Sequence, residues 1–161
     1  MSQRSTSLIF APSEAIIASR IADLICRDVG LPADCCPVCT SEEMLRGALK
    51  NVPHHRCLAV LLAARPDELD RMVALSAWLQ DLPIILMIPA GDSETIAKAH
   101  RLRPRYLMGP QVDYAELRAV IENIFWRKAA RVPSEPQSSP AMLVSLKGKA
   151  DRFFRIPNSN N

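Results

Sequence analysis

Short apolar runs alternate with longer stretches of helical periodicity along most of the chain. The runs fall at residues 8–11, 34–39, 57–62, 83–88 and 105–108. Two of them, 57–62 and 83–88, are apolar almost throughout, which is typical of central strands covered on both faces. After each run, apolar residues recur every three or four positions, as on one face of a helix. This alternation predicts an α/β fold of five βα units, with helices on both faces of a parallel sheet.

Local signals predict where several of these helices begin and end. Gly30 is a natural stop for the first helix, because glycine readily adopts the left-handed conformation that ends helices. Thr40 and Glu43 have the spacing of a capping box and predict the start of the second helix. A third helix is expected over residues 67–80, and Asp113 is the expected N-cap of the fifth.

The composition fits one ordinary globular domain. The chain has 161 residues, of which 48% are hydrophobic and 23% charged, and its net charge is +3. This charge is too small to imply nucleic-acid binding across the whole surface. The longest apolar stretch, residues 57–64, is well short of the roughly 20 residues that span a membrane. Because no secretory hydrophobic segment follows the polar start, we expect a cytoplasmic protein with no membrane partner.

The pattern also divides the chain into four parts. Residues 1–7 are expected to be a flexible N-terminus, and residues 8–130 one folded domain. Residues 131–140 are rich in proline and serine, which predicts a linker. Residues 141–161 mix basic and aromatic side chains and are too short to fold alone. We interpret them as a basic tail or as the start of a truncated output segment.

Several features of the runs point to a known family. Residues 58–62 stand in the central-strand position, Pro83 precedes the fourth run, and Tyr106 and Pro110 frame the sequence Tyr-Leu-Met-Gly-Pro. With the connecting lengths, these features resemble the receiver domain of bacterial response regulators over residues 8–127. The resemblance implies a doubly wound, flavodoxin-like (βα)5 sheet of strand order 2-1-3-4-5. It also implies a part in two-component signal transduction.

The resemblance indicates where phosphorylation would occur and which groups it would need. These are carboxylates for Mg²⁺ after the first strand, an acceptor aspartate after the third, a hydroxyl after the fourth and a lysine after the fifth. The corresponding positions here lack all of these groups: Ala11, Pro12, Ala63, Ile88 and Gly109. Nearby carboxylates do not replace them, because Glu14 and Asp67 are expected inside helices and Asp92 stands alone. The chain thus resembles a degenerate pseudo-receiver, without a catalytic residue, metal or cofactor.

Loss of these carboxylates removes like-charge repulsion from the end of the sheet, so we expect a single state that signals through its surface. The expected interaction surface comprises the fourth helix, the fifth strand and the fifth helix, with Arg101, Arg103, Arg105, Tyr106, Tyr114 and Trp126. It would bind a protein partner or a second copy of the chain. The arginines could instead be a solvated guard of the edge strand.

A cluster of cysteines and histidines superficially suggests zinc: Cys35, Cys36, Cys39, His54, His55 and Cys57. The predicted topology argues against it, because Cys39 and His54 would lie at opposite ends of the sheet. Cys36 and Cys39 leave a redox role open, although buried thiols are the simpler interpretation. A flavin is not expected, because the loop over residues 11–14 lacks the glycines of a phosphate-binding turn.

The leading hypothesis is a non-phosphorylatable regulatory domain that acts through protein contacts in bacterial signal transduction or transcription control. One alternative is the N-terminal part of a DNA-binding transcription regulator, in which only the C-terminal segment would contact nucleic acid. Another is a small-molecule or redox sensor that uses the vacated pocket or the cysteine pair.

Overall fold

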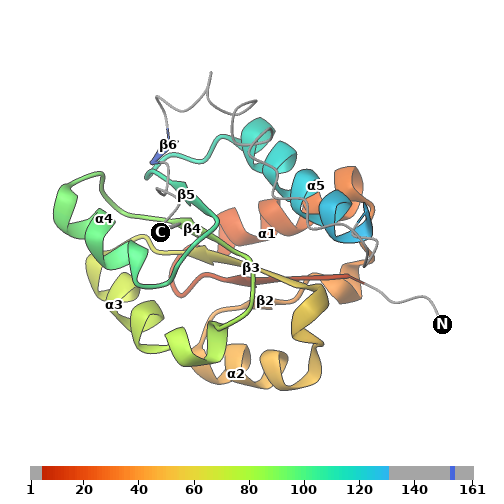
Figure 1. The fold of residues 1–161 in the computed structure, drawn as a ribbon, viewed down its shortest axis with the longest axis horizontal. Coiled ribbons are helices and arrows are strands. Elements are labelled where there is room, and N and C mark those ends of the chain that lie inside the picture. Colours follow the sequence, from red (N-terminus) through yellow and green to blue (C-terminus); the bar gives the residue numbers. More distant parts are fainter. Residues whose placement is uncertain (1–4, 131–152, 155–161) are drawn as a thin grey trace.

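Six strands form one sheet in the order β2-β1-β3-β4-β5-β6 in the computed structural model, which describes residues 5–130 and 153–154 (Figure 1). The first five strands are parallel and run over Thr6–Phe10, Val38–Cys39, Cys57–Leu62, Ile84–Met87 and Tyr106–Met108. The predicted α/β class and strand order 2-1-3-4-5 are confirmed. The sixth strand, β6 at Phe153–Phe154, pairs antiparallel with β5 and was not predicted.

The five α-helices cover both faces of the sheet (Figure 1). Their bounds are α1 Ala15–Leu24, α2 Glu42–Asn51, α3 Pro66–Ala74, α4 Ser93–His100 and α5 Tyr114–Ala130. Four short turns complete the described elements: η1 Ile25–Val29, η2 Ala33–Cys35, η3 His54–Arg56 and η4 Ser76–Leu79. None of these helices is both long and apolar enough to cross a membrane, within the part of the chain that was searched.

The sheet separates two apolar layers. One layer holds side chains from α1 and α5, such as Ile21 and Ile121, and the other holds side chains from α2, α3 and α4, such as Leu45, Leu69 and Ala99. Alternate residues of β3 enter alternate layers, and all of β3 is buried. This explains why the run at 57–62 lacks polar residues, since a strand covered on both faces needs apolar side chains at every position.

The second strand is much shorter than the predicted 34–39. Only Val38–Cys39 pairs with β1, while Ala33–Cys35 forms a 3-10 turn. The Cys35 N–H donates to the Pro32 carbonyl oxygen at 2.9 Å, which closes this turn. Pro37 has no N–H to give to a sheet, so the strand starts only after it.

Two predicted helix boundaries also shift. Helix α2 is capped by Ser41 rather than Thr40, because the Ser41 hydroxyl accepts the Met44 N–H at 3.3 Å. The predicted helix 67–80 is divided, with α3 ending at Ala74 and η4 following. There the Trp78 N–H donates to the Leu75 carbonyl oxygen at 2.9 Å, which tightens the chain into a 3-10 turn.

Other predicted boundaries are confirmed. Gly30 ends the first helical segment with a φ of 78°, the left-handed conformation that glycine adopts without steric cost. Strand β3 has the predicted bounds. Asp113 caps α5, since its Oδ1 accepts the Glu116 N–H at 3.1 Å. The predicted linker at 131–140 and nearly all of segment 141–161 lie outside the described residues.

Candidate functional site

The five positions that correspond to a phosphorylation site follow the carboxyl ends of the parallel strands: Ala11, Pro12, Ala63, Ile88 and Gly109. The Ala63 N–H donates to the Met87 carbonyl oxygen and the Ile88 N–H to the Met108 carbonyl oxygen, both at 3.0 Å. Ala63 and Ile88 therefore continue the hydrogen bonding of the sheet beyond the ends of β3 and β4. The structure places the predicted positions at one end of the sheet, where they supply no carboxylate, hydroxyl or amine.

A buried carboxylate that the sequence did not point to lies at this same end. Glu68, in the first turn of α3, is 0% exposed. The Ser13 hydroxyl donates to Oε1, and the Ala64 N–H donates to Oε2 at 2.7 Å. Ser13 belongs to the loop after β1 and Ala64 to the loop after β3. One side chain therefore ties together the two loops that flank the predicted pocket.

The electrostatics of Glu68 are those of a charge held mainly by hydrogen bonds. Its nearest cation is the Arg65 guanidinium, whose Nε lies 3.7 Å from Oε1, but the Arg65 side chain is 60% exposed. A buried carboxylate needs hydrogen-bond donors to offset its lost hydration. Both oxygens of Glu68 are already engaged within the protein. The sequence signal for this arrangement is glutamate two positions after Pro66, where a side chain can reach back to a free backbone N–H.

The other carboxylates near the pocket are occupied elsewhere. Glu14 was expected inside the first helix, but it directly precedes α1. Asp67 is in α3 and contacts the Arg65 guanidinium at 3.2 Å. Asp92 caps α4: its Oδ2 accepts the Thr95 N–H at 3.0 Å and its Oδ1 the Thr95 hydroxyl at 2.6 Å. These bonds hold the pKa of Asp92 below its usual value. No metal-binding group of three or more such residues occurs in the searched part of the chain.

Tyr106 is turned inward on β5. Its hydroxyl donates to Oε1 of Glu116, a residue of α5 that is 2% exposed. Burial, followed by this hydrogen bond and the Glu116 charge, raises the pKa of Tyr106 well above its usual value. The second carboxylate oxygen of Glu116 is buried and has no hydrogen-bond partner in the described structure. The Tyr106 ring also packs against the apolar layer under α1 and α5.

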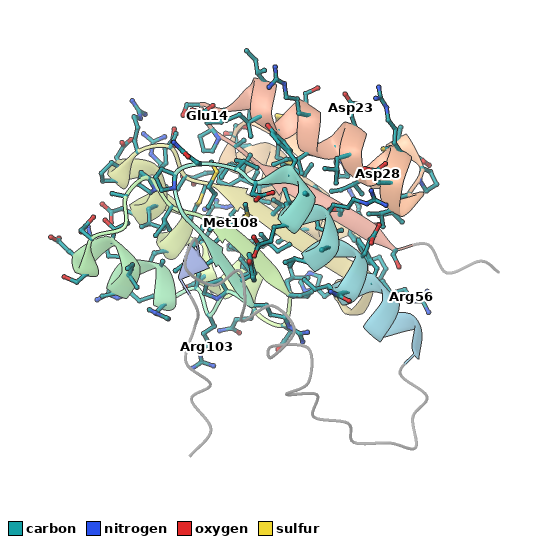
Figure 2. All side chains as sticks on the ribbon, turned by 90° about the horizontal axis from the view of Figure 1, so that it is seen from above. Glu14, Asp23, Asp28, Arg56, Arg103 and Met108 are labelled. Atoms are coloured by element: carbon teal, nitrogen blue, oxygen red, sulfur yellow. The ribbon has the colours of Figure 1, made fainter. Side chains whose placement is uncertain are left out.

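The structure gives the positions of the three arginines of the predicted interaction surface. Arg101, Arg103 and Arg105 are exposed, with buried Leu102 and Pro104 between them. Figure 2 shows Arg103 at the margin of the fold, whereas Met108 lies in its interior. Arg103 has a φ of 49°, so the backbone turns sharply just before β5. We use the name α4–β5–α5 face for this surface.

The other two residues of that surface are both in α5. Tyr114, at its start, is half-buried. Trp126 also lies within this helix, but its side chain falls outside what the structure describes. The predicted anchoring role of Trp126 therefore stays a prediction.

The cysteines are buried thiols. Cys35, Cys36 and Cys39 are buried and free. Burial, together with the nearby Cys26, raises the pKa of Cys36 to about 12, and burial raises the pKa of Cys39. Thiols of this kind are poor nucleophiles at neutral pH, which weakens the redox interpretation.

The predicted separation of the cysteines from the histidines is confirmed at Cys39. The register pairs Cys39 with Phe10 at one end of β1 and Cys57 with Thr6 at the other. His54 belongs to the turn just before Cys57. The histidine side of the cluster therefore lies far along the sheet from Cys39, which is incompatible with one zinc ion.

A second exposed surface was missed by sequence reasoning. Trp78 is 40% exposed, and the Arg46 guanidinium lies 5.6 Å from its ring centroid. Trp78 borders an open hollow of about 450 Å³, which is lined by Leu49, Lys50, Val52, His54, Ala77 and Trp78. Trp78 was assigned to a continuous helix, and nothing in the helical pattern indicated that η4 would expose it.

Comparison with known proteins supports the fold. No protein-family model and no curated protein matches the sequence. Among solved structures, the chain is similar to the signal receiver domain of a modulated diguanylate cyclase from Desulfovibrio desulfuricans G20. The two share 19% sequence identity, the match covers 79% of this chain and 98% of that one, and the TM-score is 0.57. The fold is receiver-like. At this identity the likeness concerns the arrangement of helices and strands.

Proposed function

We propose that this chain is a receiver-like regulatory domain of signal transduction that is not phosphorylated and acts through protein contacts. The observation that supports this proposal most directly is the set of side chains at the carboxyl end of the sheet. The residues that directly follow the strands are Ala11, Ala63, Ile88 and Gly109, and the buried carboxylate at this end, Glu68, already accepts hydrogen bonds at both oxygens. Phosphoryl transfer needs a free nucleophile and cations around the transferred group. The residues that follow the strands supply neither a carboxylate nor a lysine, and the nearest described cation, Arg65, is largely exposed.

The proposed contact surface is the α4–β5–α5 face. Its exposed arginines need acidic groups across the contact, because charge complementarity steers association, and in a second copy α4 offers the exposed Glu94. Its interior is preorganised, since the Tyr106 hydroxyl is already bonded to Glu116. A preformed surface loses less conformational entropy when it binds. We propose a second copy of this chain as a partner, in a homodimer through this face.

The absence of phosphorylation can be tested directly. Full-length protein is incubated with acetyl phosphate and Mg²⁺, and its intact mass and tryptophan fluorescence are measured. We expect no phosphorylated mass and no Mg²⁺-dependent fluorescence change. A stoichiometric phosphoryl adduct that disappears in Glu68→Ala or Asp92→Ala would overturn the proposal.

The contact surface is tested by sedimentation velocity over a range of protein concentrations. We expect a concentration-dependent dimer that Arg101→Glu/Arg103→Glu or Trp126→Ala weakens at least several-fold. Arg20→Glu/Arg27→Glu is the matched control, because it reverses two exposed arginines of α1 and η1, away from this face. Equal weakening by both arginine pairs, or a monomer at every concentration, would contradict a dimer through the α4–β5–α5 face.

The alternatives make different predictions. A DNA-binding regulator would bind duplex DNA with strong salt dependence and lose this binding when residues 131–161 are deleted. A thiol sensor would change its thiol titration after mild oxidation. The raised pKa of Cys36 favours the protein-contact proposal over the thiol sensor.

A further inference from the structure

β6 gives the outer edge of β5 a partner from the same chain. Leu107 lies opposite Phe154 and Met108 opposite Phe153, in antiparallel register. The other side of β5 is paired with β4. Without β6, β5 would be the last strand of the sheet, and its outward N–H and C=O groups would be open to any extended segment. β6 thus covers the outer edge of β5 in the α4–β5–α5 face (Figure 1).

The pairing is small enough to open. β6 has two residues and β5 has three. Residues 131–152 separate β6 from α5, so closing the strand restricts a long connection, at an entropic cost that grows with loop length. Few backbone hydrogen bonds oppose this cost, and each contributes little net free energy in water. A pairing this short, closed over a long connection, has little free energy to keep it closed.

β5 is also held on the side away from β6. It pairs with β4 from Ile85 opposite Tyr106 to Met87 opposite Met108. The Tyr106 hydroxyl donates to Glu116 on α5. Opening of β6 would therefore expose a strand edge that is already in a conformation able to pair.

We propose that Phe153–Phe154 is a detachable strand that closes the β5 edge within one chain and competes with dimerisation through the α4–β5–α5 face. The inference rests on the proposed function for the identity of the competing partner, a second copy of this chain. Adding a strand to a sheet edge uses backbone hydrogen bonds, and neighbouring side chains supply the specificity. Because the covering strand is tethered, its high effective concentration favours the closed monomer at low protein concentration.

Hydrogen exchange of the full chain tests whether the strand pairs. Phe153→Pro/Phe154→Pro removes two N–H groups and is incompatible with a paired strand. Asn158→Pro/Ser159→Pro is the matched control, with two prolines placed outside β6. We expect the first variant to raise amide exchange in the peptide that covers Tyr106–Met108 several-fold, with Cys57–Leu62 unchanged. Exchange equal to that of the control variant would overturn the inference, whatever the function.

A disulfide distinguishes pairing within one chain from strand exchange between two. Met108→Cys/Phe153→Cys places thiols at opposite positions in the register, and Met108→Cys/Asn158→Cys is the mismatched control. Mild oxidation should give a cross-linked monomer in the first variant alone. A covalent dimer as the main product would overturn closure within the chain.

The competition is tested on the same proline variants by sedimentation velocity. Phe153→Pro/Phe154→Pro should dimerise with a Kd several-fold lower than that of Asn158→Pro/Ser159→Pro. Equal dimerisation, together with faster exchange of β5, would refute the competition. If no variant dimerises while the exchange difference persists, the proposed dimer fails and the detachable strand stands.

Discussion

Glu68→Ala should destabilise the protein more than alanine substitution of the other carboxylates near the carboxyl end of the sheet. The substitution removes the acceptor of the half-buried Ala64 N–H in the loop after β3, which is now bonded at 2.7 Å. It also releases the Ser13 hydroxyl on the neighbouring loop. The two loops would then lose the side chain that links them directly.

The size of the effect follows from these contacts. A hydrogen bond to a charged group contributes about 1.5–3 kcal/mol, and the Ala64 N–H bond is of this kind. Ser13 is exposed, so water replaces its lost bond and the loss there is small. Removing a buried charge whose cation, Arg65, is largely exposed offsets part of the total. We expect a net loss of about 2 kcal/mol for Glu68→Ala and about 1 kcal/mol for Glu68→Gln, which retains an acceptor oxygen.

Urea unfolding followed by tryptophan fluorescence measures this loss. With a typical denaturant dependence for a small domain, a loss of this size lowers the midpoint by about 1 M urea. Glu94→Ala is the control, since Glu94 is an exposed glutamate at the start of α4. The reasoning is refuted if Glu68→Ala and Glu94→Ala have the same midpoint, or if Glu68→Gln unfolds more readily than Glu68→Ala.

Tyr106→Phe should lower stability by about 1–3 kcal/mol in urea unfolding, because it removes a donor from the buried Glu116 carboxylate; an unchanged midpoint would contradict this contact. Since folding raises the pKa of Tyr106 above 10.0, the folded state retains a proton that the unfolded state releases, and wild type should lose stability relative to Tyr106→Phe as pH rises above 10.0. A constant difference would argue against the inward position. Asp92→Ala should lower Tm and raise amide exchange at Thr95 in α4, whereas Asp92→Asn should be closer to wild type, because asparagine also caps helices. Cys36 should be alkylated slowly by iodoacetamide at neutral pH and rapidly after unfolding, and equal rates would contradict its burial.

The predictable part of the fold is the part that depends on burial. Residues 57–62 had to be apolar because β3 is covered on both faces, so the run revealed both the strand and its central place. Gly30 and Asp113 were identified because their conformation and capping chemistry are local. The second strand was overestimated, because the cysteines of residues 34–39 are compatible with both a strand and the 3-10 turn that the chain forms at Ala33–Cys35. β6 could not be predicted, since its pairing with β5 depends on a contact distant in sequence.

For the candidate site, the sequence predicted which phosphorylation groups are missing but not which side chains occupy that end of the sheet. Ala63 and Ile88 could be placed at strand ends because the runs fix where strands stop. Glu68 was missed because the periodicity of α3 places it among ordinary helical residues, and its hydrogen bond to Ser13 spans a long sequence separation. Trp78 was missed because an unbroken helix was expected where η4 forms. In each case the missing information was tertiary.

The two ends of the sheet are both very short strands, β2 at Val38–Cys39 and β6 at Phe153–Phe154. The segments most able to form amyloid-like stacks, β3 and β4, lie between other strands and are buried. A growing fibre would have to begin from the two-residue strands β2 and β6, or from the three residues of β5 when β6 opens. The order of the strands thus keeps the longest apolar strands away from the edges, a property that substitutions on the outer surface would leave intact.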